Sequence, residues 1–513
     1  MDREESDAGA ELERGSARGA QGVPWWRSPR PPGPTPWLIA RDTPPATSAA
    51  VPDTPVATVP RGGMIPPSRS PGAPFAVAVL ALVVLVATSL FADMPILSRV
   101  LVPVVGLFGT IGCARMLQQR HPDEPWLTRL LPLAVIVKLV ASVLRYLTLV
   151  NKAGQVGDAS VYDTFGRRYA LFWLGKAGAV QPQLADLKKS NFLRWFTGIV
   201  YYLFGRDLIA GFFVFGLLAL VGSYLWYRAA VLAVPYLDRK LFFILIFFAP
   251  SIVFWPSSIG KESLMQFGLG GIALGTAQIM NGRLVQGVAV ATPGAWLVYV
   301  VRAHLLGLAV LAAAFAYVFG RKSPAAQTKS SLARPVALVF VSLFALFAVT
   351  RGAQALGIKS LSLSAVQTEL DTTNASTSQG HSTFSNSNPS LSPLRLPQDA
   401  VTVLLRPFPW EVETKNQILA SLEGMALVAF IFHRRRSVAF SLRTLREQPF
   451  VFYCWNLTML YVLLFQAFGN FGLLVRERSI VLPALYVILS VKPEGTETPH
   501  APARTTRSAV RRS

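Results

Sequence analysis

The apolar residues of this chain occur in long blocks, unlike the dispersed apolar positions of a soluble core. Two examples are "PFAVAVLALVVLVATSLFA" at 74–92 and "DLIAGFFVFGLLALVGSYLW" at 207–226. A helix of about 20 apolar residues crosses the roughly 30 Å of hydrocarbon in a bilayer. The pattern therefore predicts an all-α polytopic membrane protein.

We predict about 12 transmembrane helices from these blocks. Their centres lie near residues 83, 106, 139, 217, 247, 271, 293, 312, 343, 425, 458 and 484. The apolar stretch from about 285 to 319 is too long for one span and just long enough for two. Arg302 and His304 are therefore expected at an outer turn between the seventh and eighth spans.

The positions of Lys and Arg predict how the chain is oriented, because short cytoplasmic loops are enriched in these residues. One orientation places the basic segments 238–240, 320–334 and 433–446 in the cytoplasm together with both termini. Residues 1–73, rich in Pro, Arg and Ala, predict a disordered cytoplasmic tail. Residues 74–491 form the predicted multi-span membrane domain, and 492–513 a basic cytoplasmic tail.

This orientation leaves two long loops outside, at about 151–206 and 354–416, while the other connections are short. Long loops can enclose a substrate, whereas tight turns cannot. The first contains the aromatic and basic stretch 188–205, which predicts a helix on the outer bilayer surface. The second is of low complexity in its middle, which predicts a flexible lid or spacer, and stiffens at "RPFPWE" (406–411).

Charge and cysteine content exclude several classes of protein. The net charge of +22 comes from basic residues beside helix ends and in the tails, where anionic lipid headgroups explain them, so no nucleic acid partner is predicted. The two cysteines lie in apolar segments, which indicates neither a disulfide framework nor a thiolate metal site. No Gly-rich phosphate loop such as GxxxxGK[ST] is present.

Charged and polar residues collect at the predicted outer ends of the spans. Placing a charge at membrane depth costs free energy, so these residues are candidates for a functional site. These candidate site residues are Asp158, Asp163, Lys261, Glu262, Arg302, His304, Arg406, Glu411, Asn470, Arg476 and Arg478. A carboxylate in the first loop can take a proton from an acceptor hydroxyl or hold a divalent cation. The alternative is a solvated loop whose aspartates form turns or caps.

The cationic candidates suit a phosphate group. Lys261 at a helix N-terminus and Arg302 would bind phosphate, with His304 as a hydrogen-bond donor. Arg476 and Arg478 are two residues apart, so on a helix they point about 200° apart and only one faces a cavity. Arg406 is expected to face a lipid phosphate with Glu411 orienting it, and simple headgroup anchoring is the alternative reading.

Four motifs occur in a fixed order along the chain: "PSIVFWPSSIGKES", "VRAHLLGL", "RPFPWE" followed by "ASLEG", and "GNFGLLVRERSIVLPAL". In this order they resemble membrane proteins of bacterial cell-surface polysaccharide synthesis, and more broadly the GT-C class of glycosyltransferases and the polysaccharide polymerases. The resemblance covers residues 75–491. It implies a bacterial plasma-membrane enzyme of the envelope.

The resemblance also implies chemistry. The donor would be a sugar on polyprenyl phosphate, transferred outside the cell to a glycan acceptor. Asp158 and Asp163 match the acidic residue that serves the acceptor or a metal in the GT-C class. Arg302, Arg406, Arg476 and Arg478 match the arginines that face lipid pyrophosphate in the polymerases. The paired acidic residues of several such enzymes are absent here.

Two other functions fit the same pattern. A transporter or flippase of lipid-linked glycans would use these charges to line a pathway, but it typically carries mid-span charges and internal repeats. Here only Lys138 and Arg145 fall within a span, and no repeat is evident. A non-catalytic scaffold for other envelope-synthesis proteins is the third interpretation, which the missing acidic pair favours.

Overall fold

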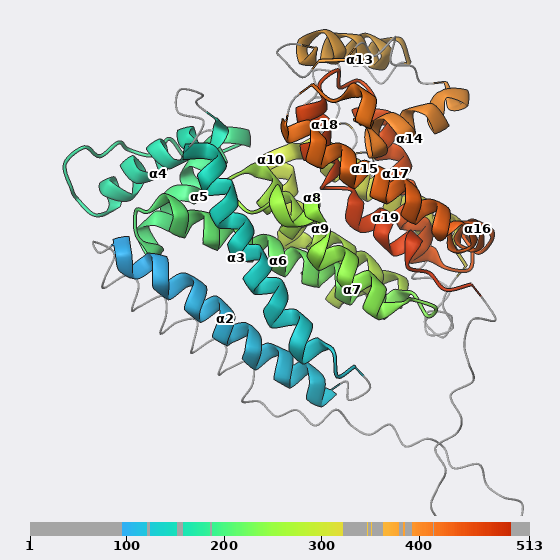
Figure 1. Ribbon diagram of the computed structural model, residues 1–513, viewed down its shortest axis with the longest axis horizontal. Coiled ribbons are helices and arrows are strands. Elements are labelled where there is room, and N and C mark those ends of the chain that lie inside the picture. Colours follow the sequence, from blue (N-terminus) through green and yellow to red (C-terminus); the bar gives the residue numbers. More distant parts are fainter. Residues whose placement is uncertain are drawn as a thin grey trace, which may run out of the picture. The chain divides into compact units, whose positions relative to one another are not determined.

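The computed structural model describes residues 95–120, 124–150, 157–184, 187–321, 363–378, 392–413 and 415–493, with the single positions 346, 350, 383 and 384. All of them belong to one compact unit, Ser70–Ser513 (Figure 1). Its helices are α2 (Pro95–Arg120), α3 (Leu127–Val150), α4 (Asp158–Trp173), α5 (Lys189–Phe204), α6 (Leu208–Ala233), α7 (Arg239–Phe248), α8 (Pro250–Phe254), α9 (Lys261–Met280), α10 (Leu284–Phe319), α13 (Leu363–Thr377), α14 (Leu396–Leu405), α15 (Lys415–His433), α16 (Arg435–Arg443), α17 (Pro449–Phe465), α18 (Phe471–Arg478) and α19 (Leu482–Leu489). Short 3-10 turns lie at Pro393–Arg395 (η1) and Pro409–Glu411 (η2).

The predicted all-α class is confirmed for the described residues, where β structure is limited to two isolated bridges. Four helices are long and apolar enough to cross a membrane: α2, α3, α6 and α10. A fifth arises if α15 and α16, which meet at a bend of 63°, count as one broken span. The chain thus has the helices of a membrane protein. The predicted count of 12 is not confirmed, and the spans predicted near 83 and 343 lie outside the described residues.

The longest helix, α10, breaks at Arg302, whose φ of −148° and ψ of 77° are not helical. Before the break, Gly294 packs against Gly268 of α9. After it, α10 contacts α17, where Asn456 donates a hydrogen bond of 3.4 Å to the Ala312 carbonyl. The interruption falls at Arg302, where the sequence predicts a turn, but the two predicted spans on either side are one membrane-length helix with a kink.

A second break separates α7 from α8. Helix α7 ends at Phe248, because Pro250 disfavours helical geometry in the preceding Ala249, whose backbone is extended. The buried Lys138 of α3 donates hydrogen bonds of 3.0 Å to the carbonyls of Ile252 and Val253 in α8, the short helix that follows the break. Lys138 thus has a structural partner at the interrupted segment, as buried irregular backbone requires.

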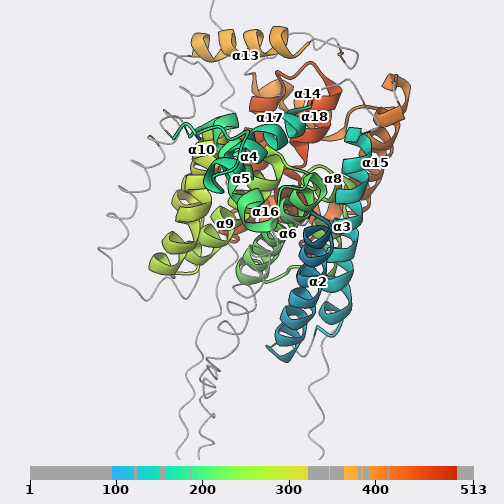
Figure 2. The ribbon, with the colours of Figure 1, turned by 90° about the vertical axis from the view of Figure 1, so that its left-hand side faces the viewer.

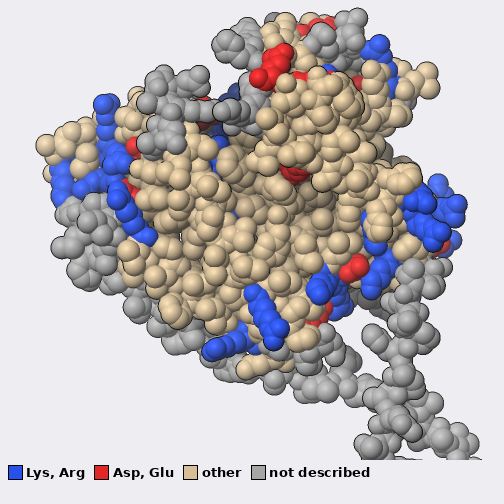
Figure 3. Space-filling view, viewed as in Figure 1, with Lys and Arg blue, Asp and Glu red and all other residues tan. Residues whose placement is uncertain are grey.

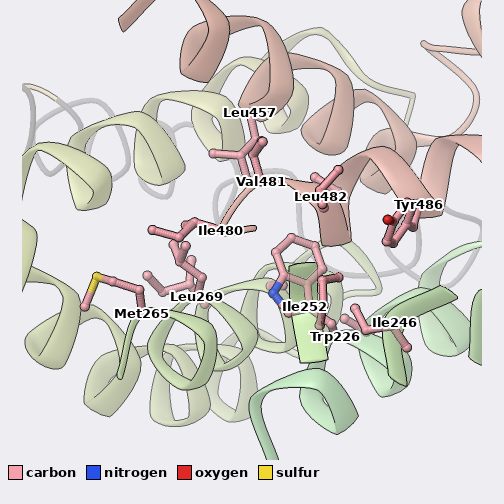
Figure 4. Packing of buried hydrophobic residues seen from close by; sticks show 14 of the residues in the cluster. Trp226, Ile246, Ile252, Met265, Leu269, Leu457, Ile480, Val481, Leu482 and Tyr486 are labelled. Carbon is pink, nitrogen blue, oxygen red and sulfur yellow. The ribbon is translucent and has the colours of Figure 1, made fainter. Parts of the chain in front are cut away.

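Helices α6, α9 and α10 form the centre of the unit through close backbone contacts. A methyl group added at Gly222 of α6 would overlap the carbonyl of Gln266 in α9, and one at Gly294 of α10 would overlap Gly268. Small residues allow such approach between helices in membranes. Apolar side chains of α6, α7, α8, α9, α17 and the segment 480–486 fill the adjoining core (Figure 4), including Trp226, Ile246, Ile252, Met265, Leu269, Leu457, Ile480, Val481, Leu482 and Tyr486.

The two predicted external loops contain helices of their own. The first holds α4 and α5, which pack on each other, and α5 also contacts α6 and α10. The second holds α13, α14 and the two 3-10 turns. Helices α2 and α3 lie side by side in two views (Figures 1 and 2). On the face drawn in Figure 3, Lys and Arg gather over α4 and over α16, and the surface between them is mainly uncharged.

Candidate functional site

The candidate site is built around Glu262, in the first turn of α9. The "PSSIG" segment before α9 brings this carboxylate into the protein, where its side chain is 4% exposed. Arg476 of α18 donates from Nε at 2.8 Å and Nη2 at 3.0 Å, and Arg302 of α10 donates from Nη2 at 3.1 Å. Burial raises the pKa of Glu262, but the charges of Arg476 and Arg302 outweigh it and leave that pKa below its usual range.

Arg302 joins a second carboxylate to this group. Both of its terminal nitrogens contact Glu477 of α18, Nη2 at 2.7 Å from Oε1. The Tyr461 hydroxyl donates to the Glu477 main-chain oxygen at 2.6 Å, which ties α18 to α17. The break in α10 at Arg302 thus lies where one guanidinium bridges carboxylates from α9 and α18.

Asp158, at the start of α4, forms the exposed edge of the site. Its carboxylate lies 3.4 Å from Arg476 Nη2, and its side chain is 58% exposed against 24% for Arg476. Burial lowers the pKa of Arg476, but Glu262, Glu477 and Asp158 raise it above its ordinary value, so this arginine stays charged. Asp158 therefore offers an accessible carboxylate beside a permanently charged guanidinium.

Two further cations stand near Glu262. Burial and the charge of Arg302 lower the pKa of Lys261, while Asp158 and Glu262 act in the opposite direction. Arg145 of α3 lies over the rings of Phe254 and Trp255 at 4.9 and 5.1 Å. Its Nε is buried without a hydrogen-bond partner in the described part of the chain. We call Asp158, Glu262, Glu477, Arg145, Lys261, Arg302 and Arg476 the charge cluster.

Sequence reasoning did not select Glu477 and Arg145 as site residues. Arg145 carried a signal, because it is a charge inside an apolar span. Glu477 also interrupts an apolar stretch, together with Arg476 and Arg478, but only the fold of α18 directs it toward Arg302.

Asp163 lies outside the charge cluster. Its side chain is 16% exposed, and both oxygens accept from Arg167 Nε at 2.9 Å. The Tyr201 hydroxyl donates to Asp163 at 2.5 Å. The pKa of Tyr201 is raised mainly by burial and also by the negative charge of Asp163. These bonds join α4 to α5, so Asp163 holds the helix pair together.

Arg478 points away from the charge cluster, as its spacing from Arg476 predicts. Its side chain is 1% exposed and donates to the carbonyls of Leu404, Arg406 and Ala420, and to Glu423 at 3.0 Å. Glu423 in turn accepts from the Ser251 amide at 2.8 Å and from the Ser251 hydroxyl. This buried junction connects α8, α14, α15 and α18.

Arg406 and Glu411 pair with each other at the end of the second predicted loop. Arg406 Nε is 2.9 Å from Glu411 Oε1, and its guanidinium lies over Phe384 at 4.3 Å and Phe471 at 5.1 Å. The Phe408 amide donates to Glu411 at 2.8 Å. The expected pairing of Arg406 with Glu411 is present, and the lipid phosphate stays a prediction.

The remaining two candidates have local roles. Asn470 caps α18, accepting from the amides of Gly472 at 2.9 Å and Leu473 at 3.2 Å. His304 follows the break in α10, with its ring 6.4 Å from that of Phe465.

No group of three or more His, Cys, Asp or Glu residues that could hold a metal occurs among the described residues. Comparisons with family models, curated proteins and solved structures found no match for this chain. A proposal for its function therefore has to start from the contacts of the charge cluster.

Proposed function

We propose that the chain transfers a sugar, or joins glycan units, outside the cytoplasm, using a sugar linked to polyprenyl phosphate or pyrophosphate. The observation that carries this proposal is the composition of the charge cluster. Arg302 and Arg476 contact Glu262, Glu477 and Asp158, and Lys261 and Arg145 lie near enough to add positive charge. The seven groups together carry one net positive charge, and one of the carboxylates is exposed. A phosphate anion suits the excess charge, and Asp158 suits the acceptor.

The donor phosphate would bind beside Arg476. Arg476 has only to release the exposed Asp158, because Glu262 remains its buried partner. Guanidinium groups bind phosphate oxygens in a bidentate manner, and their positive charge is strongest where water is excluded. Arg302, which contacts the same Glu262 oxygen as Arg476, and Lys261 add further positive charge.

The transfer step follows from this placement. Asp158 accepts the proton of the acceptor hydroxyl as its oxygen forms a bond to the anomeric carbon of the donor sugar. The bond between that carbon and the phosphate oxygen breaks, and its electron pair leaves with the polyprenyl phosphate. Arg476 and Arg302 stabilise the negative charge that develops on the leaving group.

The test uses purified full-length protein in proteoliposomes with labelled polyprenyl-phosphate hexoses. We expect Asp158→Asn to lower transfer by about 100-fold or more, because it removes a general base. Asp371→Asn, an exposed carboxylate on α13, is the matched control and should transfer normally. Full transfer by Asp158→Asn contradicts the assignment. Movement of the labelled lipid across the bilayer without sugar transfer would instead favour a transporter. If neither sugar transfer nor lipid movement occurs, the scaffold interpretation is favoured.

Orientation is tested separately with single cysteines. In a chain with Cys113 and Cys454 replaced by serine, Asp371→Cys should react with an impermeant thiol reagent outside the cell, and Arg436→Cys should not. Both positions are exposed, so protection reports the membrane side and not burial. The opposite result would place the charge cluster on the cytoplasmic side.

A further inference from the structure

Helices α4 and α5 enclose a second feature, an open pocket of about 600 Å³. Its walls carry the aromatic residues Phe172 and Trp173 at the end of α4, and Trp195 and Tyr202 on α5. Gln181 comes from the segment that follows α4. The volume falls in the range of small-molecule sites in proteins.

The sequence of α5 explains why this pocket exists. Trp195, Ile199 and Tyr202 are spaced four and three residues apart, so they share one face of the helix. The opposite face is buried against the unit through residues such as Leu193 and Tyr201. At Gly198 a side chain would collide with the Trp173 ring, so the glycine allows that ring to lie against α5.

The pocket combines aromatic faces with unused hydrogen-bonding groups. The Trp173 and Trp195 indoles, the Tyr202 hydroxyl and the Gln181 amide make no hydrogen bond with any described residue. None of these polar atoms is a buried group without a partner. They therefore stand at accessible positions around an apolar surface.

We infer that this pocket binds a saccharide. The apolar face of a sugar ring packs on aromatic rings, and the ring hydroxyls pair with polar groups at the edges. A hydrocarbon chain would fill the same volume but would make no hydrogen bond to the indole, hydroxyl and amide groups, whereas sugar hydroxyls can pair with all of them. The donors at the rim thus favour a sugar over a lipid tail.

The position of the pocket suggests which saccharide it holds, and this step rests on the proposed function. Helix α4 has Asp158 at one end and Trp173 at the other, and its 16 residues span about 24 Å. A single sugar cannot reach both ends. The pocket therefore holds the distal units of an oligosaccharide acceptor whose reacting end lies at Asp158, which favours joining glycan units over adding one sugar to a small acceptor.

Binding is tested directly with the full-length protein in nanodiscs. The probes are cellotriose, maltotriose, chitotriose and a galactotriose, followed by saturation-transfer NMR. We expect at least one to bind, and Trp173→Ala and Tyr202→Ala to weaken it about tenfold or more. Trp173→Phe, which keeps a ring, should retain part of the affinity. Trp410→Ala is the control, because Trp410 is an exposed ring that packs on Phe408 and does not line the pocket.

Two results would overturn the inference. One is that no trisaccharide binds, or that the pocket variants bind as the parent does. The other is occupancy by lipid. Brominated acyl chains in the nanodisc would then quench tryptophan fluorescence, and the quenched signal would be missing in Trp173→Phe and Trp195→Phe. That result would show that the pocket holds hydrocarbon.

The inference and the proposed function fail separately. Arg476→Ala should still bind the trisaccharide, because Arg476 is not in the pocket. Binding without any transfer activity would sink the proposed function and leave the saccharide site. Transfer whose acceptor KM is unchanged by Trp173→Ala would sink the acceptor assignment alone.

Discussion

Arg476 and Arg478 are two residues apart on the same short helix, α18, but their guanidinium groups lie in different environments. Arg476 is 24% exposed and contacts the carboxylates of Glu262 and Asp158. Arg478 is 1% exposed and is enclosed by three carbonyls and Glu423. One guanidinium can exchange an exposed partner for a ligand, whereas the other cannot leave its partners without uncovering buried acceptors.

The comparison shows that a buried arginine is not by itself a sign of a ligand site. A paired charge inside a protein offsets its desolvation only when its hydrogen bonds are complete. The junction of Arg478 with Glu423 and Ser251 comes close to this condition, and it joins four helices. The charge cluster keeps excess positive charge and one exposed carboxylate, which are features of a binding site.

The largest loss of stability is expected for Arg478→Ala. It leaves Glu423 buried without its cation, so we expect a loss of about 3–5 kcal/mol. Thermal unfolding in one detergent measures this, with Arg436→Ala on exposed α16 as a control that should change little. Partial recovery in Arg478→Met with Glu423→Gln would support the ion pair as the cause. Equal unfolding midpoints for Arg478→Ala and the control would contradict the distinction between the two arginines.

Arg302→Gln should follow, with a loss of about 2–4 kcal/mol. It leaves Glu477 without a guanidinium and Glu262 with Arg476 alone. Adding Glu477→Gln should restore part of the unfolding midpoint, because it removes the unpaired carboxylate. If the double variant is less stable than the single one, Glu477 has a further role in the fold.

Arg476→Ala should separate activity from stability. The half-exposed pair with Asp158 contributes little, so we expect a loss of about 1–2 kcal/mol, mostly from Glu262. Transfer should fall by about 100-fold or more because the leaving phosphate loses its cation. The unfolding midpoint and the transfer rate of one preparation measure both. A large fall in stability with unchanged transfer would reverse the roles of Arg476 and Arg478.

The smallest effect concerns the pair of Arg406 and Glu411. Burial raises the pKa of Glu411, but hydrogen bonds from Arg406 and Phe408 outweigh it and leave that pKa below its ordinary value. A carboxylate whose pKa is lower in the folded than in the unfolded state stabilises the fold at pH values above its unfolded pKa, which is about 4.3 for Glu. This stabilisation is lost as the pH falls from there through the folded pKa.

Hydrogen exchange can detect this loss at one amide. The Phe408 amide donates to Glu411, so its protection factor should fall on acidification below about pH 4. In Glu411→Gln the protection should be lower at neutral pH and less dependent on acid. A parent protection factor that is constant from pH 6 to about pH 3 would contradict the coupling.

Part of this architecture follows from the sequence, because a helix that crosses a bilayer needs a run of about 20 apolar residues, which is visible in the sequence. The all-α class and the presence of membrane-length helices are confirmed. The break at Arg302 was also foreseeable, because a cation divides two apolar stretches. The membrane side of each loop and the catalytic roles stay predictions.

The partners of individual charges could not be read from the sequence. Asp158 and Asp163 look equivalent in "GDASVYDTFGRR", yet Arg167 one turn later and Tyr201 of α5 occupy Asp163. Glu477 lies between two arginines but pairs with Arg302, which is distant in sequence. Such choices depend on how α18 packs against α8, α14 and α15, and no local pattern encodes that packing.

The glycine contacts of α9 have a mechanical consequence. Gly270 packs against Gly222 of α6, and Gly268 packs against Gly294 of α10, so the backbone of α9 is in close contact with a neighbouring helix on both sides. Its first turn carries Glu262, so this carboxylate belongs to a helix that is packed closely on both sides. The buried junction of Arg478 likewise ties α18 to its neighbours. When a ligand binds, the group expected to move is therefore the exposed Asp158 of α4.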